Sequence, residues 1–388
     1  MASIAPKYQV RLRDQSGVLT AIFDDWVDME FTKEVNNIGS YKFQINGEDA
    51  RRSLFELDGQ VEIWRQVAGC GLGWYKEFEG FHRLDSRSTD KEGNRIFVSD
   101  GVGLNDLLAR SIIAYKAGTI RADKNAPAET VMKEYVDENC GPTADDTVVG
   151  RLYQGGFPNF STEADLGRGP VWAGSRAFEN LLDVLRDIAN VAEMDFQIVQ
   201  TSPANFSFFT YVGQLGSDRT YTNMDVANGL NGAGNYPVMF SIPTGTIQDI
   251  EYIRDRLAEA NVVIVLGPGE GSTQDTLTRS DGIAIAASPW NRREVSRPGG
   301  DQEFDYQREQ LGDEILKEMA AKETMTFIPI QQESMLYGKH YFLGDRVTAR
   351  YDNLLGHARL TKIRIHPTSG GEEINLEFTG TGQPFGTI

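Results

Sequence analysis

The chain has 388 residues, of which 40% are hydrophobic and 10% aromatic, enough for roughly two to four domains with real cores. Its formal net charge of −18 disfavours sequence-independent nucleic-acid binding, which needs a cationic face against phosphate. No apolar run approaches the roughly 20 residues that span a bilayer, and residues 1–13 lack the apolar region of a signal peptide, so we expect no membrane insertion.

The first hundred residues contain short segments of alternating polarity, which is the pattern of half-buried strands. These segments are residues 8–12, 19–31, 41–45, 60–66, 74–81 and 95–99. Glycine and asparagine punctuate them, so they predict a barrel or sandwich. A short helix over residues 103–110 is expected to leave this module.

The middle of the chain changes character and predicts a small α+β unit. A first helix is expected with Asn125 as its cap and Pro127 in its first turn, and it should stop before Gly141. Residues 141–172 read as loop. The strongest amphipathic pattern predicts a helix from an N-cap at Ser175 to Met194, followed by strands over 195–199 and 206–211.

The next segment mixes strands with one helix. Residues 247–257 fit either a helix or a strand, and we expect a strand in the first half because 261–266 is plainly one. Residues 282–286 are interpreted as a further strand. Residues 304–319 predict an amphipathic helix, which tolerates Gly312 at a cost of about 1 kcal/mol.

Three strands with glycine turns are expected to close the chain as a closed β-module. They cover residues 346–351, 358–366 and 373–378. The middle strand is irregular, because Ala358 and Leu360 lie on one face and Ile363 and Ile365 on the other. A bulge near Thr361 or Lys362 would reconcile the two halves.

Motifs for chemistry are weak. The glycine-rich GPGEGST at residues 267–273 lacks the lysine of a phosphate loop, and Glu270 would repel an anion, so a turn is expected there. Cys70 and Cys140 allow at most one bridge; we interpret both as free thiols in a reducing cytoplasm, although the sequence leaves a bridge open.

The remaining candidate residues predict structural roles. No histidine spacing fits a standard zinc module, and the four are His82, His340, His357 and His366. Five tryptophans could stack on sugars, although packing is favoured: Trp26, Trp64, Trp74, Trp172 and Trp290. Arg292, Arg293 and Arg297 either lie in a solvated loop or form salt bridges across a subunit boundary. No catalytic, cofactor-binding or metal-binding residue is nominated.

Taken together, the order of these parts resembles a known family. The pieces AGSRAFENLLDVLRDIANVAEMDFQIV, NVVIVLGPGEGST and YFLGDRVTARYDNLLGHARLTKIRI resemble siphophage tail hub proteins, the Gp37-like tail proteins, which are related in fold to the baseplate hub of contractile phages. The resemblance covers about residues 8–378.

The resemblance implies a fold class and three domains. The fold would be mainly β with an α+β insertion, made of two β-barrel-like hub domains plus a helix-hairpin domain. The N-terminal barrel-like domain would cover residues 1–112, the insertion 113–236, and the second barrel-like domain 237–388, with a helix at 303–323.

The resemblance also implies a function. The protein would be a non-enzymatic structural hub of a tail tip or baseplate, without cofactors, and a homotrimer that adapts the sixfold tail tube and distal tail ring to a threefold tip. Its partners would be the distal tail protein ring, the tape measure protein and tip fibre or receptor-binding proteins. DNA would pass its channel without specific binding. It would lie in the virion after assembly in the host cytoplasm.

Two other classes of function remain open at this point. A glycan-cleaving tail protein needs only an Asp/Glu pair, and the abundant carboxylates allow one without nominating it. A carbohydrate-binding tail protein would use exposed tryptophans.

Overall fold

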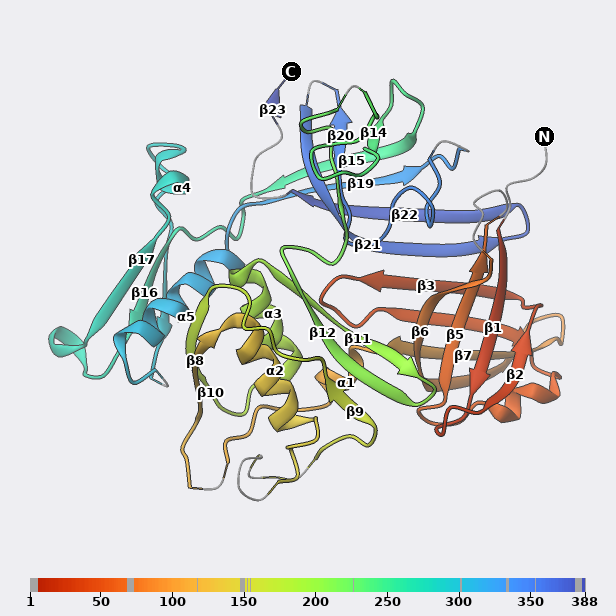
Figure 1. Ribbon diagram of the computed structural model, residues 1–388, viewed down its shortest axis with the longest axis horizontal. Coiled ribbons are helices and arrows are strands. Elements are labelled where there is room, and N and C mark those ends of the chain that lie inside the picture. The colour runs from red at the N-terminus through yellow and green to blue at the C-terminus, as the bar shows by residue number, and fades with distance from the viewer. Residues whose placement is uncertain are drawn as a thin grey trace.

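The protein is a mainly β chain, with 46% of its residues in strands and 15% in helices. Figure 1 shows it as a computed structural model. The structure describes residues 6–67, 73–116, 118–146, 151, 153, 155–225, 227–300, 302–332, 335–352, 354–380 and 386–387. The predicted fold class, mainly β with an α+β insertion, is confirmed.

The N-terminal half consists of antiparallel strands with alternate side chains buried. In β4 (Ser40–Asn46), Tyr41, Phe43 and Ile45 are buried, as the alternation predicts. The other elements are β1 (Lys7–Arg13), β2 (Leu19–Phe23), β3 (Asp28–Glu34), η1 (Ala50–Leu54), β5 (Gln60–Gln66), β6 (Tyr75–Thr89), β7 (Arg95–Gly103) and α1 (Asp106–Ala109). The stretch 19–31 is thus two strands, β2 and β3.

The C-terminal half is a second set of strands. It comprises β13 (Asp218–Arg219), β14 (Met239–Ser241), β15 (Ile247–Asp255), β19 (Lys322–Pro329), β20 (Arg346–Tyr351), β21 (Leu354–Thr368), β22 (Gly371–Gly380) and β23 (Gly386–Thr387). The three predicted closing strands are confirmed as β20, β21 and β22. β15 also confirms the preference for a strand in the ambiguous segment.

The two halves form one sheet, because β21 pairs with β3. Its main path runs β15-β19-β22-β21-β3-β4-β7-β6-β5-β1-β2 (Figure 1). The predicted closed module is wrong: within the described residues, the path does not return to itself. The reason is that part of one edge of β21 pairs with the N-terminal half instead of with a strand of its own module.

β21 contains the predicted bulge. Its register with β22 shifts between Leu360 and Lys362. An extra residue on one strand moves the following side chains to the opposite face. Ala358 and Leu360 before the shift, and Ile363 and Ile365 after it, are therefore all fully buried.

The insertion packs two helices on a hairpin. Its elements are β8 (Ala122–Pro127), α2 (Ala128–Asn139), β9 (Phe160–Thr162), β10 (Val171–Arg176), α3 (Leu181–Ala192), β11 (Met194–Ser202) and β12 (Asn205–Val212). One core unites α2, α3 and the β11–β12 hairpin. The expected helix-on-hairpin arrangement is thus present.

Both predicted helix starts in the insertion are wrong. α3 begins after Asn180, whose side chain accepts a hydrogen bond from the Leu182 amide at 3.0 Å, whereas Ser175 lies in β10. α2 begins after Pro127, whereas Asn125 lies in β8. The reason is that β8 and β10 pair with each other, and this pairing overrides the local capping signals.

Between β15 and β19 the chain forms a separate projection, residues 256–320, which we call the arm. It contains β16 (Val262–Leu266), η2 (Gly271–Thr273), β17 (Thr276–Ser280), α4 (Gly282–Ala286), β18 (Glu294–Pro298) and α5 (Asp305–Glu318). Its buried core consists of Val263, Val265 and Ile315. In Figure 1 the arm projects to the left, away from β1 and β2 at the right.

The arm confirms one prediction and corrects another. The helix expected over 304–319 is α5. A Cβ on Gly312 would lie 2.4 Å from Cγ of Arg279, so this glycine lets α5 approach β17 closely. The strand expected at 282–286 is helix α4, because the Asp281 carboxylate accepts hydrogen bonds from the amides of Ile283 and Ala284 and starts a helical turn.

Candidate assembly surfaces

The joint between the two halves is the strand pair β3–β21. Lys362 to Ile365 pair antiparallel with Glu34 to Phe31. Side chains reinforce the pairing: Arg364 bonds Glu30, and Nε2 of His366 lies 2.7 Å from Oδ1 of Asp28. A joint of backbone ladder plus ion pairs fixes both the register and the relative orientation of the halves.

A buried polar network lies beside this joint. Arg65 of β5 forms an ion pair with Glu372 of β22, and both side chains are almost inaccessible to solvent. Nε of Arg65 donates to the Tyr8 hydroxyl at 3.0 Å, and Nη1 donates to the carbonyl of Tyr337 at 3.1 Å. Glu372 also accepts from the Tyr8 hydroxyl. One arginine therefore binds groups from both halves.

A second buried carboxylate extends the network. Oε1 of Glu77 accepts hydrogen bonds from Lys33 at 2.7 Å and from the Tyr337 hydroxyl at 2.6 Å. Burial opposes ionisation of Glu77, but Lys33 and Arg65 outweigh it and lower its pKa. Burial, and then the nearby Glu372, raise the pKa of Tyr8. Glu77 is therefore ionised and Tyr8 neutral beside Arg65.

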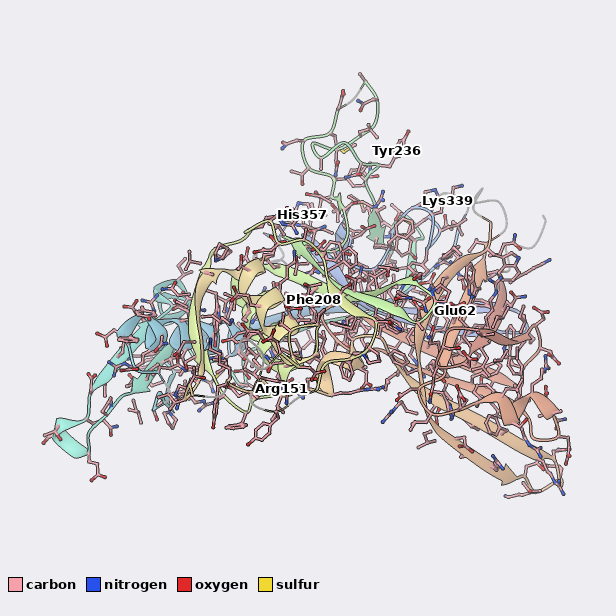
Figure 2. All side chains as sticks on the ribbon, turned by 60° about the horizontal axis from the view of Figure 1, so that its bottom comes forward. Glu62, Arg151, Phe208, Tyr236, Lys339 and His357 are labelled. Atoms are coloured by element: carbon pink, nitrogen blue, oxygen red, sulfur yellow. The ribbon has the colours of Figure 1, made fainter. Side chains whose placement is uncertain are left out.

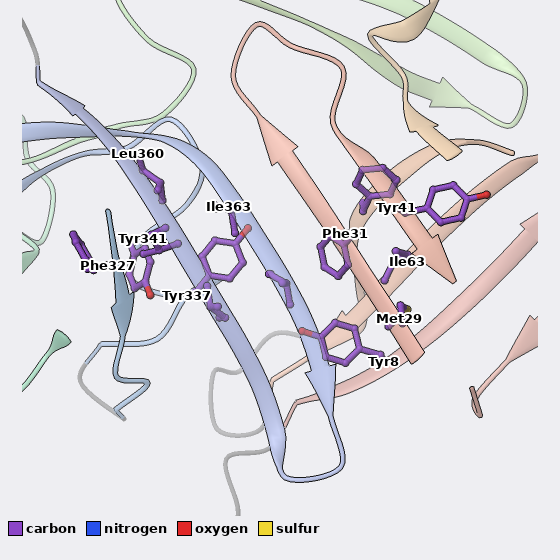
Figure 3. Packing of buried hydrophobic residues seen from close by; sticks show 14 of the residues in the cluster. Tyr8, Met29, Phe31, Tyr41, Ile63, Phe327, Tyr337, Tyr341, Leu360 and Ile363 are labelled. Atoms are coloured by element: carbon purple, nitrogen blue, oxygen red, sulfur yellow. The ribbon is translucent and has the colours of Figure 1, made fainter. Parts of the chain in front are cut away.

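Apolar side chains of both halves meet around this network. Figure 3 shows Tyr8, Phe31 and Ile63 from the N-terminal half facing Tyr337 and Ile363 from the C-terminal half. They belong to one continuous cluster. The two halves therefore share a single core across the joint.

The arm contacts the insertion through a second, smaller polar cluster. Glu314 of α5 pairs with Arg176 of β10 and accepts a hydrogen bond from Nε1 of Trp172 at 2.7 Å. Gln302 exchanges two hydrogen bonds with the backbone of Ser175, at 3.1 and 2.9 Å. These contacts hold α5 against the insertion.

A cleft of about 300 Å³ opens at this contact, and acidic groups line it. Burial, and then the neighbouring Glu314, raise the pKa of Asp187 to about 7, although Arg176 opposes the shift. Glu318 and Arg297 also line the cleft. Asp187 and Glu314 are two carboxylates that line one cleft, but Arg176 and Trp172 already bind Glu314.

All four histidines have intrachain partners. Nδ1 of His82 lies 2.8 Å from the Ser99 hydroxyl, and Nδ1 of His340 accepts from the Leu336 amide at 2.9 Å. His357 lies within 3.2 Å of two threonine hydroxyls (labelled in Figure 2), and His366 belongs to the joint. In the described part of the chain no group of His, Cys, Asp or Glu is arranged to hold a metal ion.

The glycine-rich segment is a turn, as predicted. It joins β16 to β17, and Gly267 donates its amide to the carbonyl of Asp275 at 2.9 Å. Cys140 is a free, buried thiol, whereas Cys70 lies outside the described residues. No helix in the described residues is long and apolar enough to cross a membrane.

The five tryptophans differ in solvent exposure, and one of them stands apart. Trp172 is buried, Trp26 and Trp64 are half-buried, and Trp74 is 37% exposed. Trp290 is 89% exposed, so packing within the chain does not account for it.

The three arginines have partners within the chain. Arg292 pairs with Glu294 at 2.7 Å. Arg293 donates to the carbonyls of Arg256 and Leu257. Arg297 donates to the carbonyl of Ser296 at 3.2 Å. A role across a subunit boundary stays a prediction.

One member of the joint network, Arg65, could be recognised in the sequence as a buried residue, whereas its partner Glu372 could not. Arg65 alternates with the buried Val61 and Ile63, a position that predicts a buried and therefore paired arginine. Its partner Glu372 lies 307 residues later in a turn-flanked strand, and nothing local distinguishes it from Glu373.

The fold is similar to that of phage tail proteins of known structure. The 43 kDa tail protein of prophage MuSo2 from Shewanella oneidensis is similar, with a TM-score of 0.56 and 11% identity over 96% of this chain and 98% of that one. A tail protein from Neisseria meningitidis MC58 has a TM-score of 0.54 and 13% identity over 97% of each chain. Prophage tail protein gp18 from Listeria monocytogenes has a TM-score of 0.50 and 11% identity over 96% and 94%.

The sequence identifies the family. Residues 9–379 match the family described as Siphovirus ReqiPepy6 Gp37-like protein, and the chain belongs to this family of siphovirus tail proteins. Among curated proteins, no sequence matches the chain. The resemblance drawn from the sequence is confirmed, and a structural role in the phage tail, and hence a place in the virion, follows from the family.

Proposed function

We propose that this protein is the trimeric hub of a siphophage tail tip, adapting the sixfold tail tube and distal tail ring to a threefold tip. The joint carries the proposal. It fuses two β-halves into one rigid unit, so three copies would present six β-halves around an axis. A ring of six similar units would match a sixfold tube, and its threefold chain symmetry would match a threefold tip.

The open sheet supports assembly with further copies. Within the described residues β15 and β2 end the main strand path, and each has one strand neighbour. Exposed strand edges associate readily unless something covers them. A head-to-tail ring would cover the two ends of the sheet at each subunit contact.

The proposed partners and location follow from this position. They are the distal tail protein ring, the tape measure protein, and tip fibres or receptor-binding proteins, with assembly in the host cytoplasm. The net charge of −18 supports a channel wall that DNA passes without sticking, because a wall of like charge does not bind phosphate.

The domain division is proposed on the same basis. Residues 1–112 and 237–388 would be the two barrel-like hub domains, and 113–236 the insertion. The core of the insertion is distinct from the core shared by the two β-halves, although Phe81, Leu104 and Leu108 of the first domain pack into it. The shared core of the two halves supports treating the hub domains as one rigid unit.

The hub is proposed to be non-enzymatic and without a cofactor. Asp187 gives the glycan-cleaving alternative its best candidate, because an acid with a pKa near 7 suits proton donation. That alternative predicts release of reducing sugar from host polysaccharide, lost in Asp187→Asn. If the protein is a structural hub, neither the wild type nor Asp187→Asn should release reducing sugar.

A reconstruction of the assembled tail tip tests the hub directly. The expected result is three copies around the axis beneath the distal tail ring, with a channel wall richer in Asp and Glu than in Lys and Arg. Copies absent from the axis would refute the hub. A lumen lined mainly by Lys and Arg would refute the acidic-wall argument alone.

A further inference from the structure

The arm is joined to the large sheet at a single place. The chain leaves β15 at Asp255 and re-enters the sheet in β19 at Lys322, and these two residues pair with each other. Figure 1 shows the arm extending from this point, with α5 packed against α3 of the insertion. A projection attached in this way can swing about its hinge when its contact with the insertion opens.

The contact between the arm and the insertion faces the cleft described above, and carboxylates outnumber cations there. Four carboxylates against two guanidinium groups leave two negative charges in excess. The carboxylates are Glu179 and Asp187 of the insertion and Glu314 and Glu318 of α5, and the cations are Arg176 and Arg297. Three other elements also pack on α3, namely α1, α2 and β11, but within the described residues they contribute none of the lining side chains.

The two arginines of the cleft are already engaged. Arg176 forms an ion pair with Glu314, and its Nη1 donates to the Ser175 carbonyl at 3.2 Å. Its Nε lies 3.6 Å from a carboxylate oxygen of Glu179. Arg297 is exposed, and its Nη1 donates to the carbonyl of the preceding residue at 3.2 Å. The arginines therefore compensate part of the negative charge, chiefly that of Glu314.

Asp187 is the carboxylate that has no partner. Other cations of the two contacting helices bind elsewhere: Lys317 of α5 pairs with Glu193 at 3.0 Å, and Arg186 of α3 pairs with Asp183 at 3.5 Å. Within the described residues, Asp187 receives no hydrogen bond and forms no ion pair. A half-buried carboxylate that faces other carboxylates without a donor of its own is costly to ionise.

We propose that the contact between the arm and the insertion is a pH-sensitive latch, which is closed while Asp187 is protonated and loosens when Asp187 ionises. An ionised Asp187 on α3 repels Glu314 and Glu318 on α5, and opening the cleft to water relieves this repulsion. The latch is a property of one chain, so it does not depend on the trimer proposed above.

The sign of the pH dependence follows from the two states of the arm. When the arm is docked, burial and then Glu314 raise the pKa of Asp187 to about 7, whereas water around an open cleft would return this pKa to about 4. A raised pKa in the docked state favours docking at low pH. This contribution is lost as pH rises from about 4 to 7.

Hydrogen exchange of the full chain tests the latch. The Ser175 amide in β10 donates to Oε1 of Gln302 in the arm at 3.1 Å, so its protection requires a docked arm. Between pH 5.5 and pH 8, after correction for the intrinsic pH dependence of exchange, protection of Ser175 and of α5 should fall on the order of 10-fold. Protection of β21 should stay constant. Constant protection at Ser175 and in α5, or an equal fall in β21, overturns the latch.

Matched substitutions show whether Asp187 carries the effect. In Asp187→Asn, the protection of Ser175 and α5 should no longer fall with pH. Asp183→Asn is the control, because this side chain is 68% exposed on the same helix, and the variant should keep the wild-type pH dependence. Glu318→Gln leaves Asp187 in place but removes one of the opposing charges, so it should reduce the pH dependence. Full wild-type pH dependence in both Asp187→Asn and Glu318→Gln overturns the latch.

The latch and the hub can fail separately. A monomeric protein whose arm shows the expected pH-dependent exchange supports the latch and contradicts the trimeric hub. A trimer whose arm exchanges independently of pH overturns the latch and leaves the hub intact.

Discussion

The joint is held by many buried contacts, whereas the arm is fixed to the insertion by few. The joint combines a strand ladder, a continuous apolar cluster and a buried arginine with partners from both halves. Within the described residues, the arm has a small core of three buried side chains with four partly buried ones against it, and a buried ion pair and a few hydrogen bonds fasten it to the insertion. The difference indicates a rigid central body with a more easily displaced projection, which suits the hub proposed above.

The largest effect is expected at the joint. Glu372→Gln leaves the Arg65 charge buried without its counter-ion, which should lower the free energy of unfolding by about 3 to 5 kcal/mol. Chemical denaturation measures this loss. Glu373→Gln is the control, because that neighbouring side chain is exposed, and the account fails at the joint if both variants lose the same amount.

A smaller and local effect is expected where the arm meets the insertion. Glu314→Gln should weaken the contact with Arg176 by about 2 to 3 kcal/mol, less than at the joint, because Glu179 stays 3.6 Å from Arg176 and keeps part of the charge compensated. Hydrogen exchange should accelerate in α5 and β16 while β21 stays protected, because the arm opens without the joint. Glu309→Gln, exposed on the same helix, should leave exchange unchanged. Equal acceleration in β21 would contradict the separation of the two regions.

The two regions should also respond to pH with opposite sign. The pKa of Asp187 is raised to about 7 when folded and lies near 4 when unfolded, so its contribution is present at low pH and is lost as pH rises from about 4 to 7. The pKa of Glu77 is lowered by folding, so its contribution is present above about pH 4.5 and is lost on acidification below that value.

Asp187→Asn isolates the first of these effects. The variant should be more stable than wild type at pH 8, by about 2 kcal/mol after allowance for partial solvent access. Below pH 4 the difference should vanish. Denaturation curves across pH 4 to 8 measure it, with Asp183→Asn on the exposed face of α3 as the control. A constant difference at all pH values would refute the titration.

The smallest effect is expected away from both regions. Arg95 pairs with Glu48 at 2.9 Å, and both side chains are more than 60% exposed. Arg95→Gln should change the free energy of unfolding by less than about 0.5 kcal/mol, because solvent screens exposed pairs. Thermal unfolding measures this change, and a loss comparable to that of Glu372→Gln would show that burial does not set the difference between the pairs.

The local pattern of polarity was enough to predict individual strands, but not which strands pair with each other. The alternation at Tyr41, Phe43 and Ile45 predicts β4, and the broken alternation across Leu360 predicts the bulge in β21. The pairing of β21 with β3 joins residues more than 300 positions apart, and neither strand carries a local mark of the other. The open sheet therefore could not be read from either half alone.

Helix boundaries were lost where long-range pairing competed with a local signal. Ser175 has the side chain of an N-cap, but its backbone belongs to the β8–β10 pair. At 282–286 the opposite happened: short apolar alternation favoured a strand, while the Asp281 cap fixed a helical turn. Arg65 shows the same limit at the site, because burial was visible in the sequence and its distant partner Glu372 was not.

Light scattering on the purified protein, alone and mixed with the distal tail protein, tests the trimeric hub most directly. We expect a particle of three times the 43.1 kDa chain mass, alone or on the distal tail ring. A strict monomer under both conditions would contradict it.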